Sequence, residues 1–432
     1  MTDRASAPAS VPEIAAALAE ARERTLALVA CLDDRDLVRV HSPLMSPLVW
    51  DLAHIAAFED LWLVHRFGGR ALLRGDLAEV YDAFETPRAR RGDLPLLGPA
   101  AAREYLAAVR ERTLEELEAR GAGDGQLHEM VLRHEHQHNE TMLQTLQLAE
   151  LDTYRLPGRL PPAAGGAERF SGLEFVEVPG GECTIGAPAG GFAYDNERPR
   201  HRVDVPGHAL ARTPVTNSSY LSFIEAGGYE RREWWSDDGW AWKQQHGITR
   251  PAGWSAGLDT ERRLDRVVEL NGQHPVVHVS WFEADAFARA HEARLPSEAE
   301  WEKAASWDAA SGRARRYPWG GEPPVPGHHA NLDHRAGGPA PVGAHPAGAS
   351  PCGCLGMIGD VWEWTSSPFS AYPGFRAHPY REYSEPFFGD AHRVLRGGAW
   401  ATRARVISAS FRNWDYPQRR QIFAGFRLAR DL

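Results

Sequence analysis

The sequence of 432 residues lacks several features that would assign it to a class at once. It has no run of about 18 apolar residues, so we expect no transmembrane helix and no membrane partner. Residues 1–10 lack the basic start and apolar middle of a signal peptide. Its four cysteines are too few for a disulfide framework, and Cys352 and Cys354 are too close in sequence for an ordinary bridge. These absences predict a cytoplasmic protein with reduced thiols.

Basic residues are not in excess either. The chain has 48 Lys and Arg against 58 Asp and Glu, which gives a net charge of −10 and a pI near 6.0. This balance argues against a general nucleic-acid binder. The length suggests two or three domains, and we expect a monomer.

Residues 1–156 are predicted to form a helical domain. Apolar residues recur at helical spacing in four segments, which are Pro12–Leu32, Pro47–Phe67, Pro99–Arg120 and Gly125–Leu151. Four helices of this length favour an antiparallel bundle, a fold that often holds metal sites between facing helices. The connection over residues 68–97 is long for a bundle, and long ordered loops are often functional.

A change in composition marks a second domain. Residues 157–166, PGRLPPAAGG, have the composition of a linker, which we place at 157–170. From 171 to 432 short β-like runs such as Glu174–Pro179 alternate with turns, and helical spacing returns at Asn217–Ala226 and Trp281–Ala293. We therefore predict an α+β chain, with a helical bundle followed by a compact domain that has little regular secondary structure.

The segment Arg133–Glu140, RHEHQHNE, carries the clearest chemistry. On a helix His134 and His138 are four residues apart, so both imidazoles project from one face and can share a metal ion. His136 points elsewhere, and Glu140 lies two residues past His138 and points away from the pair. The flanking residues are apolar, which argues against a plain solvated face. The pair requires at least a third ligand from another part of the chain.

His54 is the best candidate for that third ligand. It lies on the apolar side of the second predicted helix, and His65, near the end of that helix, ranks second. A lone histidine there is more often a satisfied core residue, but the pair on a partner helix favours a ligand. Three neutral imidazoles suit Zn, Fe, Ni or Cu, whereas Glu140 in place of one imidazole would complete a facial triad for Fe(II).

Arg88 and Arg91 form a basic cluster in the long connection. They fit either a solvated loop or a two-pronged clamp for substrate carboxylates.

These residues have a family resemblance that covers nearly the whole chain. His54 followed by His134-x3-His138-x-Glu140 resembles the DinB-like metal-binding domain of ergothioneine-biosynthetic sulfoxide synthases, the hercynine oxygenases. The second half resembles the formylglycine-generating-enzyme-like, C-type-lectin-related domain. Its motifs here are Gly172–Gly181, His274–Trp281, Arg294–Glu302, Gly359–Trp364, Arg393–Trp400 and Gly425–Arg427.

The resemblance implies Fe(II)- and O2-dependent joining of a thiol to carbon 2 of the imidazole of hercynine, which is Nα-trimethylhistidine. The product is a sulfoxide. By resemblance His54, His134 and His138 are the iron ligands, in agreement with their spacing. Gln137 matches a residue near the hercynine imidazole.

The remaining substrate contacts are also implied by resemblance. Asn413 and Trp414 match residues around the ammonium and carboxylate end of hercynine, and an indole face suits a quaternary ammonium. Arg88 and Arg91 match the pair that binds the carboxylates of γ-glutamylcysteine, and Asp415 matches the residue that binds its amine.

A tyrosine hydroxyl near the iron is a further family feature. Tyr380 in the segment Pro379–Phe388 is our assignment, with Tyr383 and Tyr372 as alternatives. It is implied to steer oxidation toward the carbon–sulfur bond and away from sulfinic acid.

Other functions fit less well. A formylglycine-generating enzyme needs a cysteine pair in the C-terminal segment, where this chain has Phe411–Asp415 without cysteine. A Zn-dependent DinB-type thiol transferase would not need the second domain, and a non-catalytic binding module would not need three histidines. Free cysteine as the thiol donor stays open, as does a structural Ca2+ in the lectin-like domain.

Overall fold

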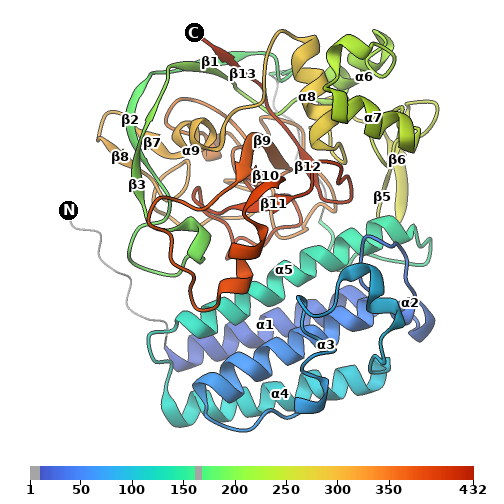
Figure 1. Ribbon diagram of the computed structural model, residues 1–432, viewed down its shortest axis with the longest axis vertical. Coiled ribbons are helices and arrows are strands. Elements are labelled where there is room, and N and C mark those ends of the chain that lie inside the picture. Colours follow the sequence, from blue (N-terminus) through green and yellow to red (C-terminus); the bar gives the residue numbers. More distant parts are fainter. Residues whose placement is uncertain (1–9, 161–167) are drawn as a thin grey trace. The chain divides into compact units, whose positions relative to one another are not determined.

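The protein consists of two compact units. The computed structural model describes residues 10–160 and 168–432 (Figure 1). Unit 1 comprises Met1–Pro157 with Gly190–Phe192, and unit 2 comprises Gly158–Ala189 with Ala193–Leu432. Residues 161–167 of the predicted linker, and residues 1–9 of the N-terminal segment used to argue against a signal peptide, lie outside the described residues. The division into 1–156, 157–170 and 171–432 stays our prediction.

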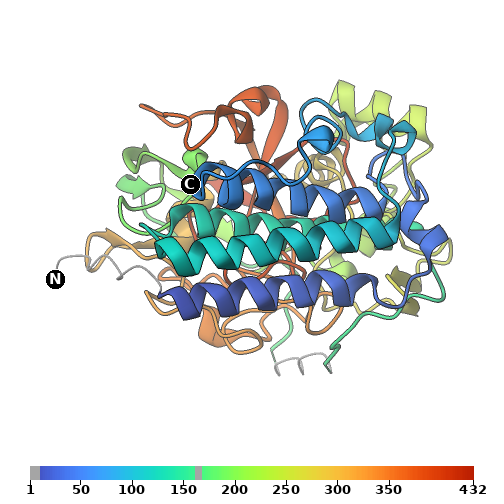
Figure 2. The same ribbon diagram turned by 90° about the horizontal axis from the view of Figure 1, so that it is seen from below.

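Unit 1 is a four-helix bundle, as predicted. Its long helices lie side by side in Figures 1 and 2, with α3 packed on α4 and α5, and α1 packed on α5. They are α1 Val11–Val29, α3 Leu48–Glu59, α4 Pro99–Arg120 and α5 Gln126–Ala149. Short elements connect them, namely α2 Asp34–Val38, the π-helical η1 Asp60–Phe67 that continues α3, and the 3-10 turns η2 Gly75–Leu77 and η3 Arg88–Asp93.

Local signals in the sequence fix the helix ends. Ser10 and Glu13 form a capping box at the start of α1, where the Ser10 backbone N–H donates to the Glu13 carboxylate at 2.7 Å. Pro99 opens α4, where a proline loses no helical hydrogen bond. Gly121 ends α4 with φ +73°, a left-handed value that a side chain disfavours.

A buried ionic network holds the four helices together. Each long helix contributes one residue: Arg22 from α1, Glu59 from α3, Arg110 from α4 and Glu135 from α5. Arg22 contacts Glu59 at 2.8 Å and Glu135 at 2.9 Å, and Arg110 contacts the same carboxylates at 2.7 and 3.1 Å. Every charge is paired twice, which offsets part of the cost of removing it from water. Because Glu135 follows His134, the network also fixes the rotation of α5.

Unit 2 is built from short antiparallel strands. One sheet has the order β1-β4-β13 and another the order β11-β10-β9-β12, in which only β12 and β9 pair parallel. The strands of these sheets are β1 Phe175–Val178, β4 His208–Ala211, β13 Ala429–Asp431, β11 Asn413–Asp415, β10 Gly389–Arg396, β9 Trp362–Phe369 and β12 Ala424–Gly425.

Smaller elements complete unit 2. Three two-stranded pairs are β2 Gly181–Ile185 with β3 His201–Val205, β5 Thr260–Arg263 with β6 Arg266–Glu269, and β7 Trp307–Asp308 with β8 Arg313–Ala314. The helices are α6 Asn217–Glu225, α7 Asp237–His246, α8 Trp281–Ala290 and α9 Glu298–Ser306. The 3-10 turns are η4 Asp195–Glu197, η5 Arg232–Trp234, η6 Pro346–Gly348, η7 Arg381–Tyr383 and η8 Glu385–Phe387.

The α+β prediction is confirmed, with one difference in detail. The strand near Glu174 and the helices near Asn217 and Trp281 are present, but the eight-residue strands β9 and β10 did not show in the sequence pattern. The first four residues of β9 are all buried, so the strand lacks the alternation that identifies a half-exposed one.

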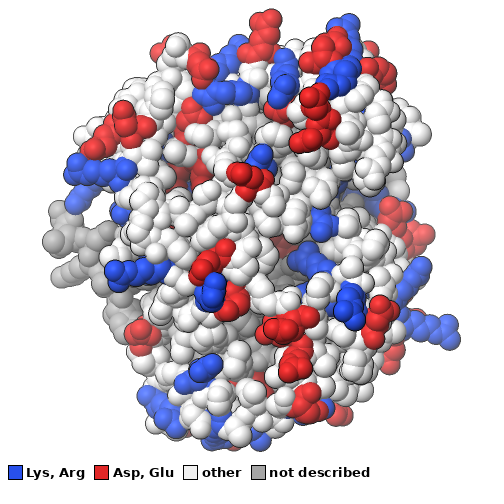
Figure 3. All heavy atoms as spheres, viewed as in Figure 1, with Lys and Arg blue, Asp and Glu red and all other residues white. Residues whose placement is uncertain are grey.

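The surface carries both signs of charge. Figure 3 shows acidic and basic side chains interspersed over the face drawn, with large uncharged areas between them. Among the described helices, none combines the length and the apolar content that crossing a bilayer requires.

Candidate metal centre

Three histidines from two neighbouring helices converge in unit 1. His54 on α3 and the pair His134 and His138 on α5 each offer a ring nitrogen, and these atoms lie within 4.8 Å of one another. The Nε2 atoms of His54 and His134 are 3.1 Å apart. Among the described residues, no other set of three or more His, Cys, Asp or Glu meets this criterion. The structure thus brings together the three residues that the spacing singled out.

Hydrogen bonds from the far side orient two of the rings. His54 Nδ1 lies 2.6 Å from the carbonyl oxygen of Tyr81, and His138 Nδ1 lies 2.8 Å from Asp51 Oδ1. With the proton on Nδ1, each ring directs an Nε2 lone pair toward the centre of the cluster. Such outer contacts are the usual way in which proteins fix the tautomer and orientation of metal-binding histidines.

Burial favours the neutral form of two of the imidazoles. Removal from water, and then the neighbouring His138, lowers the pKa of His54 and of His134 well below the ordinary histidine value. The helices therefore hold nitrogen lone pairs close together, and a bound cation would offset their mutual repulsion.

Asp51 supplies a second sign that a cation fits here. Its side chain is 0 % exposed, and Oδ2 has no hydrogen-bond partner within the described parts of the chain. A metal ion among the imidazoles would offset the charge of this buried carboxylate through His138. The donor set, three imidazole nitrogens with two of the rings held by outer hydrogen bonds, therefore fits a transition metal that keeps open positions for other ligands.

An aromatic stack supports His54. The Trp50 ring lies parallel to the His54 ring, with centroids 4.5 Å apart and planes 13° from parallel. The guanidinium of Arg91 covers Trp50 at 3.6 Å from the ring centroid. Arg91 also donates to the Thr86 carbonyl and the Ser46 hydroxyl, each at 2.8 Å. The stacking of Arg91 on Trp50, and of Trp50 on His54, restricts the movement of the His54 ring.

The two predicted clamp arginines differ in their surroundings. Arg91 is 5 % exposed and anchored by the contacts above, whereas Arg88, at the start of η3, is exposed. Arg91 is therefore not a solvated loop residue. The role of Arg91 toward a substrate stays a proposal.

His65, the second-ranked ligand candidate, is not part of the cluster. Its side chain is exposed, and Nδ1 contacts the Arg70 carbonyl at 2.8 Å. Eleven residues are about three turns of α-helix, which would return His65 to the face of His54. The chain instead widens into the π-helical η1 after Glu59, and the face is lost.

The other residues of the motif on α5 lie beside the cluster. His136 and Glu140 are buried and stand outside the group of three ring nitrogens. Gln137 is half-buried and directly precedes His138.

Two of the predicted hercynine contacts, Asn413 and Trp414, lie on β11 in unit 2, together with Asp415, the predicted contact of the thiol substrate's amine. Trp414 stacks on Phe369 of β9, with centroids 4.1 Å apart and planes 8° from parallel, so one indole face is covered. Tyr383 presents its edge to Trp414 at 5.9 Å. Asp415 Oδ2 accepts a hydrogen bond from Gln421 at 3.0 Å, and Asn413 Oδ1 accepts one from the Trp414 backbone at 2.9 Å.

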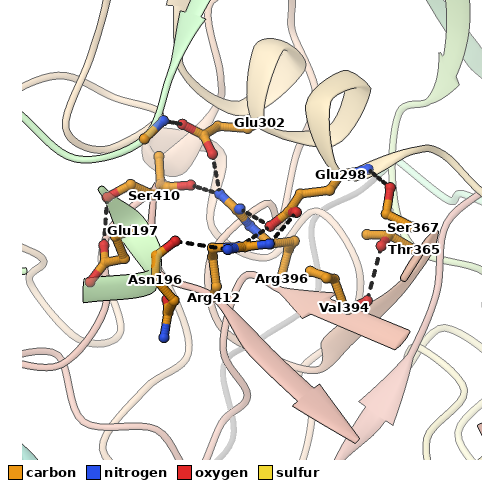
Figure 4. A network of polar contacts seen from close by, with 12 residues as sticks. Asn196, Glu197, Glu298, Glu302, Thr365, Ser367, Val394, Arg396, Ser410 and Arg412 are labelled. Carbon is orange, nitrogen blue, oxygen red and sulfur yellow. Dashed lines mark hydrogen bonds and ion pairs between the residues drawn. The ribbon is translucent and has the colours of Figure 1, made fainter. Parts of the chain in front are cut away.

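A buried charge network fixes the base of β11 (Figure 4). Arg412, one residue before the strand, donates to both carboxylate oxygens of Glu298 on α9, at 2.7 and 2.9 Å. Arg396 at the end of β10 donates to Glu298 and Glu302, each at 2.7 Å. Burial raises the pKa of Glu298, but Arg412 and Arg396 lower it below its ordinary value. The network ties α9 to the end of β10 and the start of β11.

The three candidate tyrosines have different environments. Tyr372 is buried against the Arg412 guanidinium, 4.2 Å from its ring centroid, and burial raises its pKa. Tyr383 stacks on Tyr194 at 4.3 Å. Tyr380 is half-buried, with its ring 6.2 Å from that of Tyr383.

Comparisons with known proteins agree with this architecture. The family model described as the DinB superfamily matches residues 17–149, and the Sulfatase-modifying factor enzyme 1-like domain matches residues 161–432. A hercynine oxygenase of Mycobacterium tuberculosis is 49% identical, over 98% of this chain and 100% of that protein. The chain belongs to the hercynine oxygenase family.

Further relatives separate this family from its neighbour. A hercynine oxygenase of Mycolicibacterium thermoresistibile is 50% identical, over 97% of this chain and 95% of that protein. A formylglycine-generating enzyme of Streptomyces coelicolor is 32% identical and covers 59% of this chain. The hercynine oxygenases therefore match nearly the whole chain, whereas the formylglycine-generating enzyme matches only part of it.

Sequence reasoning missed the residues that support the cluster. Asp51 and Trp50 stand three and four positions before His54, and so lie on the same helical face. An aspartate inside an apolar helix was the available signal, since a buried carboxylate requires a partner. The Tyr81 carbonyl carried no signal, because any residue supplies a carbonyl.

Proposed function

We propose that this chain is a non-haem Fe(II)- and O2-dependent sulfoxide synthase. It joins the thiol of γ-glutamylcysteine to carbon 2 of the imidazole of hercynine, in ergothioneine biosynthesis. One observation carries the proposal: three histidines, two of them held by outer hydrogen bonds, converge in a chain that shares about half of its residues with hercynine oxygenases along nearly its full length.

The proposed reaction balances without another reductant. A carbon–sulfur and a sulfur–oxygen bond form, the thiol proton and the carbon-2 hydrogen are lost, and the second oxygen atom leaves as water. His54, His134 and His138 would hold the iron, which supplies O2 activation and lowers the pKa of a bound thiol.

The proposed hercynine contacts come from charge and shape. The indole of Trp414 suits the trimethylammonium group, because a desolvated cation is attracted to the π-electrons of an indole. Asn413 offers an amide to the carboxylate end. Gln137 offers an amide beside the imidazole.

The proposed thiol contacts require opposite charges. γ-Glutamylcysteine carries two carboxylates and one amine. Arg88, exposed on η3, can bind a carboxylate with two parallel hydrogen bonds. Arg91, in the same turn, adds positive charge from a position fixed by its hydrogen bonds. Asp415 offers a carboxylate to the amine.

Tyr380 is proposed to deliver a proton or hydrogen atom that directs the oxidant toward the carbon–sulfur bond. Tyr380 is half-buried, whereas the alternative Tyr372 is packed into the core.

The test is reconstitution of the full chain. Metal-free protein is loaded anaerobically with Fe(II) or Zn(II), given hercynine and a thiol, and exposed to O2. We expect O2 consumption and a sulfoxide by mass spectrometry with Fe(II) only. O2-independent turnover with Zn(II) would instead establish a thiol transferase and overturn the proposal.

The thiol donor is decided by the same assay. Parallel kinetics with γ-glutamylcysteine and free cysteine should give the higher kcat/KM for the former. A clear preference for cysteine would leave the oxygenase proposal intact and remove the proposed carboxylate contacts of Arg88 and Arg91.

A further inference from the structure

Two cysteines that the proposed reaction does not use lie together in unit 2. The Sγ atoms of Cys352 and Cys354 are 3.7 Å apart, and both thiols are free. Gly353 between them has φ +92°, a turn conformation suited to glycine. The Ser350 backbone N–H donates to the Cys354 carbonyl at 2.9 Å, and the Gly353 N–H donates to the Ser350 carbonyl at 2.9 Å. This tight turn holds the two side chains close together.

The two sulfurs have different environments. Cys352 is half-buried, whereas Cys354 is 0 % exposed and packs in the core of unit 2 with Trp301 and Met357. The pair therefore combines a half-buried cysteine with a fully buried one.

The surroundings favour a thiolate at Cys352. The hydrogen bond with Cys354 lowers the pKa of Cys352 to about 6, with help from the Ser350 hydroxyl at 3.3 Å and from Arg427, although burial acts in the other direction. The neighbouring thiolate and burial raise the pKa of Cys354. The thiolate is the form of cysteine that attacks peroxides and disulfides.

We propose that Cys352 and Cys354 form a reversible thiol–disulfide site that reacts with peroxides or low-molecular-weight disulfides. With hydrogen peroxide, the Cys352 sulfur attacks one oxygen and becomes a sulfenic acid as water leaves. The Cys354 thiol then displaces the hydroxyl group as a second water. One peroxide is reduced, two thiols are oxidised to one disulfide, and dithiol reductants reverse the reaction.

The geometry requires only a local adjustment. The sulfurs approach from 3.7 Å to the ~2.05 Å of an S–S bond. Because the bridge encloses a single residue, it restricts the unfolded chain little and adds little stability. We therefore do not expect this bridge to stabilise the fold. This agrees with the sequence argument that Cys352 and Cys354 do not form an ordinary structural disulfide.

The experiment compares the four cysteines of the full-length protein. Reduced protein is treated with hydrogen peroxide, blocked with N-ethylmaleimide, digested and analysed by mass spectrometry. We expect the peptide with both cysteines to escape alkylation and to be lighter by two hydrogen atoms. Dithiothreitol should restore both thiols.

Matched variants identify the sulfurs. Cys31→Ser removes an exposed thiol and Cys183→Ser a buried one whose pKa burial raises to about 11, and neither should change the result. Cys354→Ser should leave Cys352 as a sulfenic acid, and Cys352→Ser should leave Cys354 as a thiol. The proposal is overturned if both thiols of the wild-type pair stay alkylatable under peroxide that oxidises Cys31. Because that comparison uses the wild-type protein, it holds even if a variant does not fold.

Discussion

Replacement of Asp51 should weaken metal binding, even though Asp51 is not a proposed ligand. Its carboxylate accepts the hydrogen bond from His138 Nδ1 at 2.8 Å and is 0 % exposed. The negative charge makes the imidazole a better electron donor and keeps Nε2 directed at the cluster. In metalloproteins, loss of such a partner costs roughly 10- to 100-fold in metal affinity.

Two substitutions of Asp51 should lower the metal affinity by different amounts. Asp51→Asn keeps the shape and one acceptor oxygen but removes the charge, so we expect the lower end, about 10-fold, or ~1.4 kcal/mol. Asp51→Ala also removes the acceptor and frees the His138 ring, so we expect the upper end, about 100-fold, or ~2.7 kcal/mol.

The assay is an anaerobic Fe(II) titration of the full chain against a chromophoric chelator. Asp60→Asn is the matched control, because Asp60 is also buried on this helical stretch but accepts from the Leu73 backbone and the Tyr105 hydroxyl. It should leave metal affinity unchanged. Wild-type affinity in folded Asp51→Ala protein would refute the reasoning that the carboxylate acts through His138.

Further predictions concern the metal, the bundle and the substrate contacts. Removal of the metal by a chelator should abolish sulfoxide formation, and added Fe(II), but not Zn(II), should restore it. Glu59→Gln leaves Arg22 and Arg110 to share one carboxylate and should destabilise the bundle by about 3–5 kcal/mol in urea unfolding, whereas the exposed Glu111→Gln should have little effect. Burial raises the pKa of Glu59, but Arg110 and Arg22 lower it below its ordinary 4.5, so the ionised form stabilises the fold. This stabilisation should be complete above about pH 4.5 and lost as the pH falls further, and stability independent of pH there would contradict the pairing. Trp414→Ala should raise the KM for hercynine about 2- to 30-fold and the KM for the thiol much less, as expected for loss of a cation–π contact. Tyr380→Phe should increase the share of sulfinic acid made from the thiol, and wild-type product ratios would show that Tyr380 is not the proposed donor.

Much of the helical unit could be predicted because its signals are local. Helical spacing, Pro12 and Pro99 in first turns, and the four-residue step from His134 to His138 are all read from neighbouring positions. The π-helical stretch after Glu59 was not predictable in this way. It changes the number of residues per turn without a proline or glycine, and it removed His65 from the face on which an α-helix would have placed it.

The second unit was less predictable for a related reason. Strands β9 and β10 obtain their partners from tertiary packing. Burial of consecutive residues, the first four of β9 and the last three of β10, hides the alternation of a half-exposed strand. The contacts that hold β11 are equally distant in sequence, since Arg412 pairs with Glu298 more than a hundred positions away. The family motifs contained these residues, but the sequence alone did not show that they form one buried network.

The sequence by itself determined the bundle, the α+β class, and the choice of His54, His134 and His138 as candidate ligands, because helical spacing and apolar neighbours are local signals. Tertiary structure alone decided what orients them: the Tyr81 carbonyl behind His54, Asp51 behind His138, and Arg91 stacked over Trp50. It also placed two free thiols 3.7 Å apart where the one-residue spacing suggested no bridge. The physical reason is that periodicity reports which face a side chain occupies, whereas a hydrogen bond or a sulfur–sulfur contact depends on ångström-scale positions set by the whole fold.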